Sequence, residues 1–144
     1  MPIDNIFGIA GSALNAQMAR MNAVASNLAN ASTVAGSEKE AYRGKRTVFK
    51  AVLEDQSQNK VPRDQTYQGG VRIDSLIDDP SPVRRMSDPG NPLADKDGFV
   101  YLSNVNEMTE MVEMMAASRS YQNNVEVVNT ARQLMSRTID IIKA

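Results

Sequence analysis

The side chains that could carry chemistry in this chain are carboxylates, lysines and hydroxyls, because its 144 residues include neither Cys nor His. Without Cys there is no disulfide, thiolate nucleophile or thiolate metal site. Without His the chain lacks the commonest general base and metal ligand. Any catalysis would therefore depend on acidic pairs or lysines, and any metal site on oxygen ligands.

The strongest candidate for a metal site is the segment Asp95-Lys96-Asp97-Gly98. Its acids and glycine match positions 3, 5 and 6 of a twelve-residue calcium loop. Positions 1 and 12, which should supply strong ligands, would be Leu93 and Asn104, and neither is acidic. The segment therefore predicts a turn before a strand and no metal site.

Asp78 and Asp79, together with Glu54 or Asp55, are the candidate acid pair for glycoside chemistry. Adjacent carboxylates beside a proline-rich turn are more typical of a solvated loop. The sequence contains no glycine-rich phosphate loop, nucleophile elbow or zinc-protease motif. We therefore expect no enzyme, no cofactor and no small-molecule substrate.

Composition limits the partners as well. A net charge of −1, from 16 basic and 17 acidic residues, gives no reason to expect nucleic acid or an anionic membrane. No apolar run approaches 18 residues, so we expect no membrane insertion. The N-terminus lacks the basic start and apolar block of a secretory signal, so any export would use another route. Nine Met against three Phe and no Trp indicate an adaptable apolar surface.

Residues 105–143 predict a long amphipathic helix, because apolar residues recur at intervals of seven and neither Pro nor Gly interrupts them. The repeating row is Met114, Tyr121, Val128, Met135 and Ile142. A second row at Met111, Val125, Ala131, Thr138 and Ile139 widens it into a stripe. Acidic residues near the start and basic residues near the end complement the helix dipole.

Residues 3–30 predict a second long helix, with a similar heptad-like row at Ile3, Phe7, Gly11, Leu14, Met18, Met21, Ala25 and Leu28. Between Asp4 and Glu38 the only charged residue is Arg20. A solvent-facing helix normally carries charges, so this face of Asn, Ser, Gln, Thr and Ala suits protein contacts on several sides. The alternative is a helix buried within its own domain.

The middle of the chain, residues 35–104, predicts short strands at Thr47–Leu53, Val71–Ile77 and Phe99–Leu102, separated by Gly- and Pro-rich turns. Residues 54–66 are polar and predict a mobile loop. These strands are too few and too short for a self-sufficient core. The core must then be completed by the terminal helices or by other chains.

The predicted fold class is mainly α with a small β part. We expect the long terminal helices to pair as a coiled-coil-like hairpin, and the middle to form short antiparallel strands and extended loops. The predicted division is an N-terminal helix within 1–34, a middle segment 35–104 and a C-terminal helix within 105–144. The two helices would form one terminal-helix domain.

Motifs at both ends carry a resemblance to a known family. Asn27-Leu28-Ala29-Asn30 followed by Thr33, and SRSYQNNVEVVNTA at 118–131, resemble the flagellar axial proteins, which are rod, hook and hook-associated subunits. The usual Thr-x-Gly-aromatic continuation is altered, since Tyr42 and Arg43 follow only after an insertion. This departure most resembles the proximal rod subunits, as do Val48-Phe49, Asp79-Pro80-Ser81-Pro82, Asp88-Pro89-Gly90, Asn104-Val105-Asn106 and Glu110-Met111-Val112. Asn123 stands where the family pattern has Ala.

The resemblance implies a structural subunit of the flagellar proximal rod, the tubular drive shaft that transmits torque and forms the export channel wall. It implies export by the flagellar type III apparatus without a cleaved signal peptide, and assembly in the periplasm. The implied partners are other proximal and distal rod subunits, basal-body adapter and export-gate components, and the surrounding rings. Two alternatives stay open: a small coiled-coil adaptor or export chaperone of a type III secretion system, and another rod subunit or injectisome component.

The predicted functional residues are subunit contacts on the two helix rows. They are Phe7, Leu14, Met21, Asn27, Leu28, Asn30, Met114, Tyr121, Val125, Val128, Met135 and Ile142. Asn27 and Asn30 share a helix face, where Asn is a poor choice unless its amide is used. We expect both amides to bond to the C-terminal helix or an adjoining subunit, the alternative being that Asn30 only ends its helix in the left-handed conformation. Ser12 is expected on the exposed side.

Overall fold

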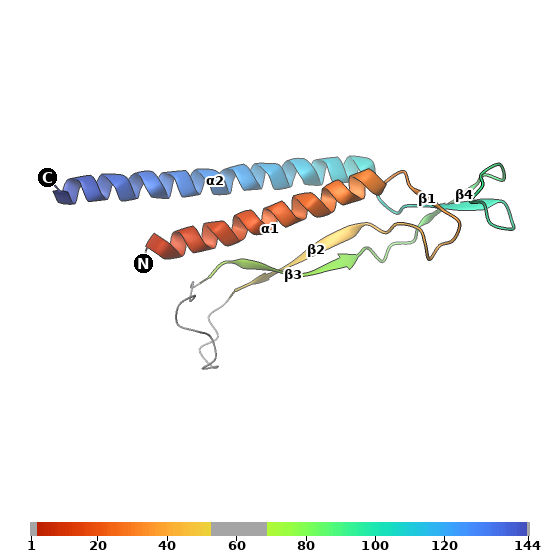
Figure 1. Ribbon diagram of the computed structural model, residues 1–144, viewed down its shortest axis with the longest axis horizontal. Coiled ribbons are helices and arrows are strands. Elements are labelled where there is room, and N and C mark those ends of the chain that lie inside the picture. The colour runs from red at the N-terminus through yellow and green to blue at the C-terminus, as the bar shows by residue number, and fades with distance from the viewer. Residues whose placement is uncertain (1–2, 53–68, 144) are drawn as a thin grey trace, which may run out of the picture.

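The computed structural model of the protein describes residues 3–52 and 69–143. Two long helices, α1 (Ile3–Asn30) and α2 (Glu107–Lys143), run side by side in opposite directions (Figure 1). Their bounds agree closely with the predicted helices at 3–30 and 105–143. Figure 1 also shows α2 extending past the beginning of α1. The predicted mobile loop at 54–66 lies outside the described residues.

Local hydrogen bonds fix the helix ends that face the middle of the chain. Asn106 caps α2, because its Oδ1 accepts a hydrogen bond of 3.1 Å from the Thr109 N–H. Glu107 and Glu110 lie in the first turn, where negative charge complements the helix dipole. At the end of α1, both the N–H and the hydroxyl of Thr33 donate to the Asn30 carbonyl. These bonds satisfy backbone groups that a helix end leaves free.

Two small antiparallel sheets occupy the chain between the helices. The first is a hairpin of β2 (Lys45–Ala51) and β3 (Val71–Asp78), in which Lys45 pairs with Asp78 and Ala51 with Val71. The second has the strand order β1-β5-β4, formed by Val34–Ala35, Phe99–Leu102 and Arg84–Ser87. The predicted strand at 47–53 is thus shifted toward the N-terminus, and β1 and β4 have no counterpart among the predicted strands.

The molecule is layered around α1. The hairpin lies along α1 on the side away from α2 (Figure 1), and both of its strands contact that helix. The three-stranded sheet extends beyond the end of α1, far from the end of α2. Since α1 has a helix on one side and a hairpin on another, it must bury two of its faces.

The predicted fold class is wrong in its central feature, because the helices do not pair as a coiled coil with interlocking large apolar side chains. The buried side chains among the described residues of α2 are Glu110 and Ala117, one charged and one small. The large apolar row predicted for the contact, Met114, Tyr121, Val128 and Met135, is only half-buried. Positions predicted to widen the stripe are exposed instead: 47% for Met111, 36% for Val125 and 44% for Ile139. Thr138 is exposed as well.

The same correction applies to α1. Met18 of the predicted row is 44% exposed and Ala25 is also exposed, whereas Ala10, Ala23 and Val24 are buried. The physical reason is the second neighbour: α1 contacts both α2 and the hairpin, and small side chains let both approach closely. A heptad search for large apolar residues cannot identify such a contact.

The buried core is small for a chain of this length. Nine apolar side chains are buried among the described residues, and six of them are alanines: Ala10, Ala16, Ala23, Val24, Ala31, Ala41, Val100, Val105 and Ala117. Twenty large apolar side chains are exposed in the same part of the chain. Burial of an alanine removes far less apolar surface from water than burial of Leu or Ile. The chain therefore leaves most of its large apolar groups outside its own core.

Candidate assembly surface and buried polar cluster

Asn27 is fully buried and all of its amide hydrogen-bonding capacity is used. Its Nδ2 donates to the Lys45 carbonyl at 3.0 Å and to Glu110 Oε2 at 2.9 Å. Its Oδ1 accepts from the Lys45 N–H at 2.7 Å and from the Tyr42 hydroxyl at 3.1 Å. The amide therefore binds the backbone edge of β2 much as a neighbouring strand would, and it also reaches α2.

Glu110 is the other fully buried member of this cluster. While Oε2 accepts from Asn27 on α1, Oε1 accepts from Arg46 Nη1 on β2 at 2.8 Å. The Nε of Arg46 lies 3.5 Å from Asp79 Oδ2, just after β3. A buried carboxylate is tolerated only when it is paired and hydrogen-bonded. Glu110 meets that condition only while α1, α2 and β2 are docked together.

Two more acidic residues tie the start of α2 to α1 and to the turn that follows α1. Glu113 forms an ion pair with Arg20, and Glu107 Oε1 accepts a hydrogen bond of 2.8 Å from the Ser32 hydroxyl. The three glutamates at 107, 110 and 113 lie within the first seven residues of α2. We call these glutamates with their partners Ser32, Asn27, Arg46 and Arg20 the acidic clamp.

The first half of α1 has its own tie to the hairpin. The Ser12 hydroxyl accepts a hydrogen bond of 3.1 Å from the Val71 N–H and donates to the Ile9 carbonyl at 2.7 Å. Ser12 is half-buried, so its predicted place on the exposed side is wrong. The adjoining Gly70 has a φ of 120°, a region that favours glycine. A Cβ built on Gly70 would lie 2.8 Å from the Ser12 hydroxyl, so glycine also permits this close approach.

The two asparagines singled out from the sequence have different roles. The predicted bond from Asn27 to the C-terminal helix is present. Asn30 donates to the Ser26 carbonyl at 2.8 Å within its own helix, and among the described residues its amide has no bond to α2. The other predicted possibility, a bond to an adjoining subunit, stays a prediction. Asn30 ends α1 without a left-handed conformation, since no described residue other than glycine has a positive φ.

The other predicted contact residues lie on the flanks of the helix pair. Phe7, Leu14, Met21 and Leu28 on α1, and Met114, Tyr121, Val128 and Met135 on α2, are all half-buried. Val125 and Ile142 are 36% and 79% exposed. Each of these side chains retains surface that a neighbouring chain could cover. Contact with another subunit stays a prediction for all twelve residues.

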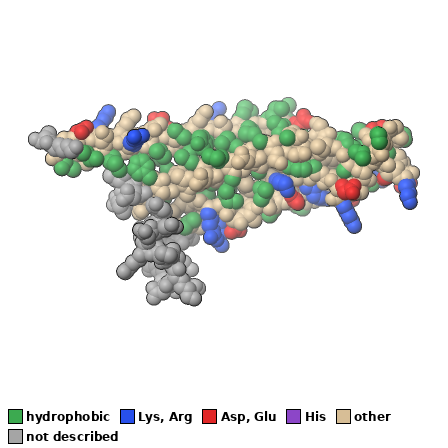
Figure 2. All heavy atoms as spheres, viewed as in Figure 1, with side chains coloured by type: hydrophobic (Ala, Val, Ile, Leu, Met, Phe, Trp, Pro, Cys, Tyr) green, Lys and Arg blue, Asp and Glu red, His purple; other side chains and the backbone are tan. Residues whose placement is uncertain are grey.

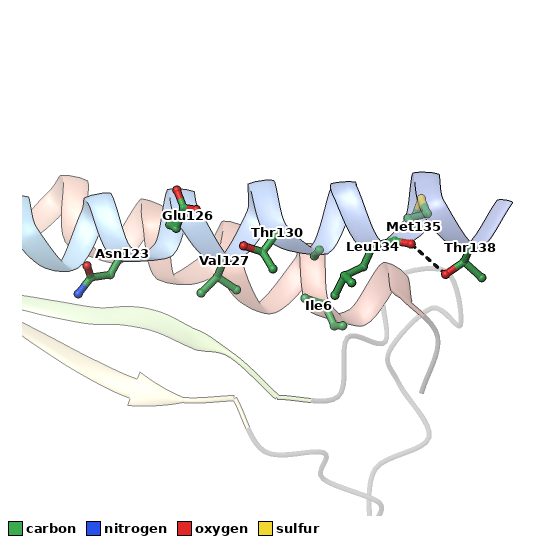
Figure 3. Close-up of a pocket in the computed structure, with 9 residues that line it drawn as sticks. Ile6, Asn123, Glu126, Val127, Thr130, Leu134, Met135 and Thr138 are labelled. Carbon is green, nitrogen blue, oxygen red and sulfur yellow. Dashed lines mark hydrogen bonds between the residues drawn. The ribbon is translucent and has the colours of Figure 1, made fainter. Parts of the chain in front are cut away.

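An apolar groove opens where α2 passes the beginning of α1 (Figure 3). Its volume is about 600 Å³, and among the described side chains Ile6 is the one α1 residue that lines it. Val127 and Leu134 project from α2 toward Ile6 in Figure 3, and they are 50% and 59% exposed. Asn123, which departs from the family pattern, is exposed at the edge of this groove.

A second apolar surface lies near the start of α2. Met108, Val112 and Met115 are spaced four and three residues apart and are 72%, 55% and 62% exposed. Hydrophobic side chains gather along the helices in the face shown in Figure 2, with few charges among them. Contiguous exposed apolar surface of this kind marks sites of contact with other proteins or membranes.

The candidate chemical residues have structural roles. Asp95 Oδ1 accepts hydrogen bonds from the N–H groups of Phe99 and Asp97, each 2.9 Å long, so the segment forms the predicted turn. The Phe99 N–H is also the main cause that lowers the pKa of Asp95 below 3.8. Asp78 accepts a hydrogen bond of 3.0 Å from Lys45 Nζ, and the Ser81 N–H donates to Asp79. The other proposed acids, Glu54 and Asp55, lie outside the described residues.

Sequence reasoning missed Glu110, Arg46 and Tyr42 as members of the polar cluster. One signal for Glu110 was available: it lies seven residues before Ala117, on a row that continues through Asn124 and Ala131. A charge on a row of small residues indicates a buried partner. No comparable signal marks Arg46, because its role depends on how the hairpin docks against α1.

Comparison with known proteins places this geometry in a family. Residues 7–36 match the model of the flagella basal body rod protein, and residues 96–141 match that of the flagellar basal body rod FlgEFG protein C-terminal region. The flagellar basal-body rod protein FlgC of Yersinia enterocolitica is 48% identical, and that of Salmonella typhimurium is 45% identical. The FlgC of Buchnera aphidicola subsp. Acyrthosiphon pisum is 45% identical. Each alignment covers 98% of both chains.

A pair of terminal helices with a small core, open apolar flanks and rod-family regions at both ends defines a flagellar basal-body rod protein. The chain belongs to the family of the flagellar basal-body rod protein FlgC. It is a structural subunit of the rod of the flagellar basal body. Among the described residues no helix is long and apolar enough to span a membrane.

Proposed function

We propose that this chain is a subunit of the proximal rod, in which its two terminal helices form the tube wall and its middle segment, residues 35–104, forms an outer layer. In this arrangement the chain transmits torque and helps to form the wall of the export channel. It acts as a structural element and not as an enzyme. The three-part division of the chain into 1–34, 35–104 and 105–144 belongs to this proposal.

The observation that supports the proposal best is the imbalance between core and surface. Nine buried apolar side chains, six of them alanines, stand against twenty exposed large ones within the described residues. Exposed apolar surface of this extent favours association, because its burial is the main driving force of protein assembly. The exposed groups lie on both helices and on the hairpin, so the subunit needs neighbours on several sides.

Location and partners follow from the same proposal. The subunit is exported by the flagellar type III apparatus without a cleaved signal peptide and joins the rod in the periplasm. Its neighbours are proximal and distal rod subunits, the adapter and export-gate components below, and the surrounding rings. It has no nucleic-acid partner, and an overall charge of −1 agrees with that expectation.

Purified basal bodies give the test. The gene is deleted in the bacterium that encodes it and restored with a copy carrying a small C-terminal epitope. We expect the deletion strain to lack complete rods and motility, and the epitope to be found in the purified rods of the restored strain in several copies per particle. An adaptor or export chaperone would be absent from purified rods, and that result would contradict the proposal.

A further inference from the structure

Strand β3 presents an open edge along most of its length. Its one neighbouring strand within the described residues is β2. In an antiparallel ladder the backbone groups of successive residues point alternately toward the partner strand and away from it. The bond from the Asp79 N–H to the Gly44 carbonyl fixes this alternation, so Leu76 and Asp78 turn their backbone groups away from β2.

Helix α1 covers this edge at its beginning, where Ser12 accepts a hydrogen bond from the Val71 N–H. The C-terminal half of β3 lies on the side of the hairpin away from α1 (Figure 1). Five of its last six side chains, within residues 73–78, are exposed. A strand edge of this length offers a row of unpaired backbone groups to a further strand.

The open half of β3 carries negative charge. Residues 73–78 include Asp74 and Asp78 and no basic residue. Lys45 Nζ donates to Asp78 at 3.0 Å within the hairpin, whereas Asp74 lies 3.9 Å from Arg72, at the limit of an ion pair. Asp74 therefore keeps most of its capacity to bind a cation from outside the chain.

Strand β4 presents a second open edge, with the opposite charge. Within the described residues it pairs with β5 alone, and all four of its residues are exposed. It carries Arg84 and Arg85 and no acid, and neither arginine forms an ion pair with a described residue. Arg85 lies 3.6 Å from the centre of the Phe99 ring, and Arg84 Nε donates to the Ser103 carbonyl over 3.4 Å. Both guanidinium groups retain N–H donors for a carboxylate.

The segment between the two strands, residues 79–83, keeps their edges apart within one chain. It contains Pro80 and Pro82. The carbonyl of Ser81 between them accepts hydrogen bonds from Arg43 Nη1 at 3.1 Å and from Asn104 Nδ2 at 2.9 Å. These bonds fix the segment, and β3 and β4 belong to different sheets. The acidic edge must therefore find a basic edge on another chain.

We propose that the open edge of β3 binds β4 of a second copy of this chain, so that one sheet continues across the subunit boundary. The proposal rests on the proposed function, because neighbouring copies meet in a rod. Backbone hydrogen bonds join the strands, Asp74 pairs with an arginine of β4, and Met86 covers the exposed Leu76 and Ile77. Since the two edges differ, a copy can use β3 toward one neighbour and β4 toward another, and such a contact propagates.

Cross-linking tests the contact, because a chain without Cys reports only on introduced cysteines. Two differently tagged copies, one with Leu76→Cys and one with Met86→Cys, are expressed together in the deletion strain. Purified basal bodies are treated with a short bismaleimide. We expect a dimer that carries both tags, at least tenfold more abundant than when Met86→Cys is replaced by Lys39→Cys, an exposed position in the turn after β1.

The outcomes separate this proposal from the proposed function. If both copies are present in purified rods but form no such dimer, the strand contact is wrong and the rod assignment stands. Cross-links to a different rod protein alone would likewise exclude a second copy as the occupant. Absence of the chain from purified rods would refute both proposals.

Exchange of charge across the boundary gives a second test. Asp74→Arg or Arg84→Asp alone sets like charges against each other and should lower the dimer yield about fivefold. A chain with both changes should recover the parent's yield, because each altered edge then meets its complement. Lys96→Glu, at an exposed turn position outside both edges, should have no effect. A double variant that cross-links no better than the single variants would show that the two edges do not face each other.

Discussion

The two ends of the helix pair are built on different principles. At the clamped end, residues 20–30 of α1 meet residues 107–117 of α2 through buried polar groups, alanines and the ion pair of Arg20 with Glu113. At the free end, the first turns of α1 around Ile6 lie beside an open groove along residues 123–138 of α2, whose apolar side chains are half-buried or exposed. Hydrogen bonds and ion pairs with fixed geometry hold the two helices of one chain in register, whereas exposed apolar surface can be covered by neighbouring subunits.

A polymerising subunit must hold its own helices in a defined register and must also keep apolar surface free for its neighbours. In this chain the two ends of the helix pair divide these tasks. A subunit that buried all of its apolar groups in its own core would have little surface left for assembly. A subunit with no internal ties would have no defined register between its helices. The acidic clamp supplies register through few residues, and the rest of the helix surface stays available.

The largest effect on stability should be seen when a carboxylate is added at one end of the helix pair and, in a separate variant, at the other. Ala117→Asp puts a carboxylate at a fully buried position near the clamp, and we expect the isolated chain to lose several kcal/mol of folding free energy. Val128→Asp changes a half-buried position of the free end, where the expected loss is below about 1 kcal/mol. Urea unfolding of both variants measures the contrast.

Val128→Asp should impair rod assembly much more than it destabilises the isolated chain. Its side chain retains surface that the proposed rod contacts would cover, so Val128→Asp should still be exported but should block rod assembly and motility. A normally swimming Val128→Asp strain would show that this flank is not an interface. Equal destabilisation of the two isolated variants would show that the ends are not different.

Removal of the clamp's central carboxylate should have the next largest effect on stability. Glu110→Ala leaves Arg46 with only Asp79 and frees one donor of Asn27, and loss of one partner of a buried ion pair costs about 3–5 kcal/mol. We expect the lower part of that range, because Arg46 is 41% exposed. Thermal unfolding of Glu110→Ala beside Glu126→Ala measures it, and similar midpoints would contradict the buried role.

Glu110→Gln sharpens this prediction. The amide oxygen of Gln can still accept from Arg46 or from Asn27, but its NH₂ group would oppose the other donor. We therefore expect Glu110→Gln to fall between the parent and Glu110→Ala. A Gln variant as unstable as the Ala variant would indicate that charge, and not hydrogen-bond geometry, dominates the clamp.

The two asparagines of the sequence motif should differ. Asn27→Ala leaves both backbone groups of Lys45 and one oxygen of Glu110 without their partner, and each buried unsatisfied group costs about 1–3 kcal/mol. Asn30→Ala removes one bond within its own helix and should cost less. Asn22→Ala, an exposed position of the same helix, is the control. Urea unfolding should rank the variants in that order, and equal losses for Asn27 and Asn30 would contradict the structural difference.

The sequence predicted the local elements better than their contacts. The bounds of both helices and the strand at 99–102 follow from periodicity and turn residues, which act within a few residues. The coiled-coil pairing was wrong because the hairpin occupies a second face of α1, and no local pattern reports where a hairpin docks. For the same reason the amide of Asn27 was recognised, whereas its partners Lys45 and Tyr42 were not.

The smallest expected effect is that of acid on Asp79, which pairs with Arg46 of the acidic clamp. Hydrogen bonds from Ser81 are the main cause that lowers the pKa of Asp79 below 3.8, and Arg46 lowers it further. A carboxyl whose pKa is lower in the folded chain stabilises it above the unfolded pKa. That contribution is lost as the pH falls through the folded value. Below about pH 4, protonation of Asp79 should therefore weaken its ion pair with Arg46. The clamped end should then be destabilised before the free end.

Asp79→Asn isolates this contribution from the other carboxylates, which titrate in both chains. We expect the parent to lose more stability than Asp79→Asn between pH 6 and pH 3, as measured by thermal midpoints across that range. The variant should start from a lower midpoint at pH 6, because its neutral amide cannot form the ion pair with Arg46. Asp97→Asn, at an exposed turn position, should retain the parent's slope. If the slopes of the parent and Asp79→Asn were the same, Asp79 would contribute nothing to the pH dependence, and the clamped end would depend on its buried groups alone.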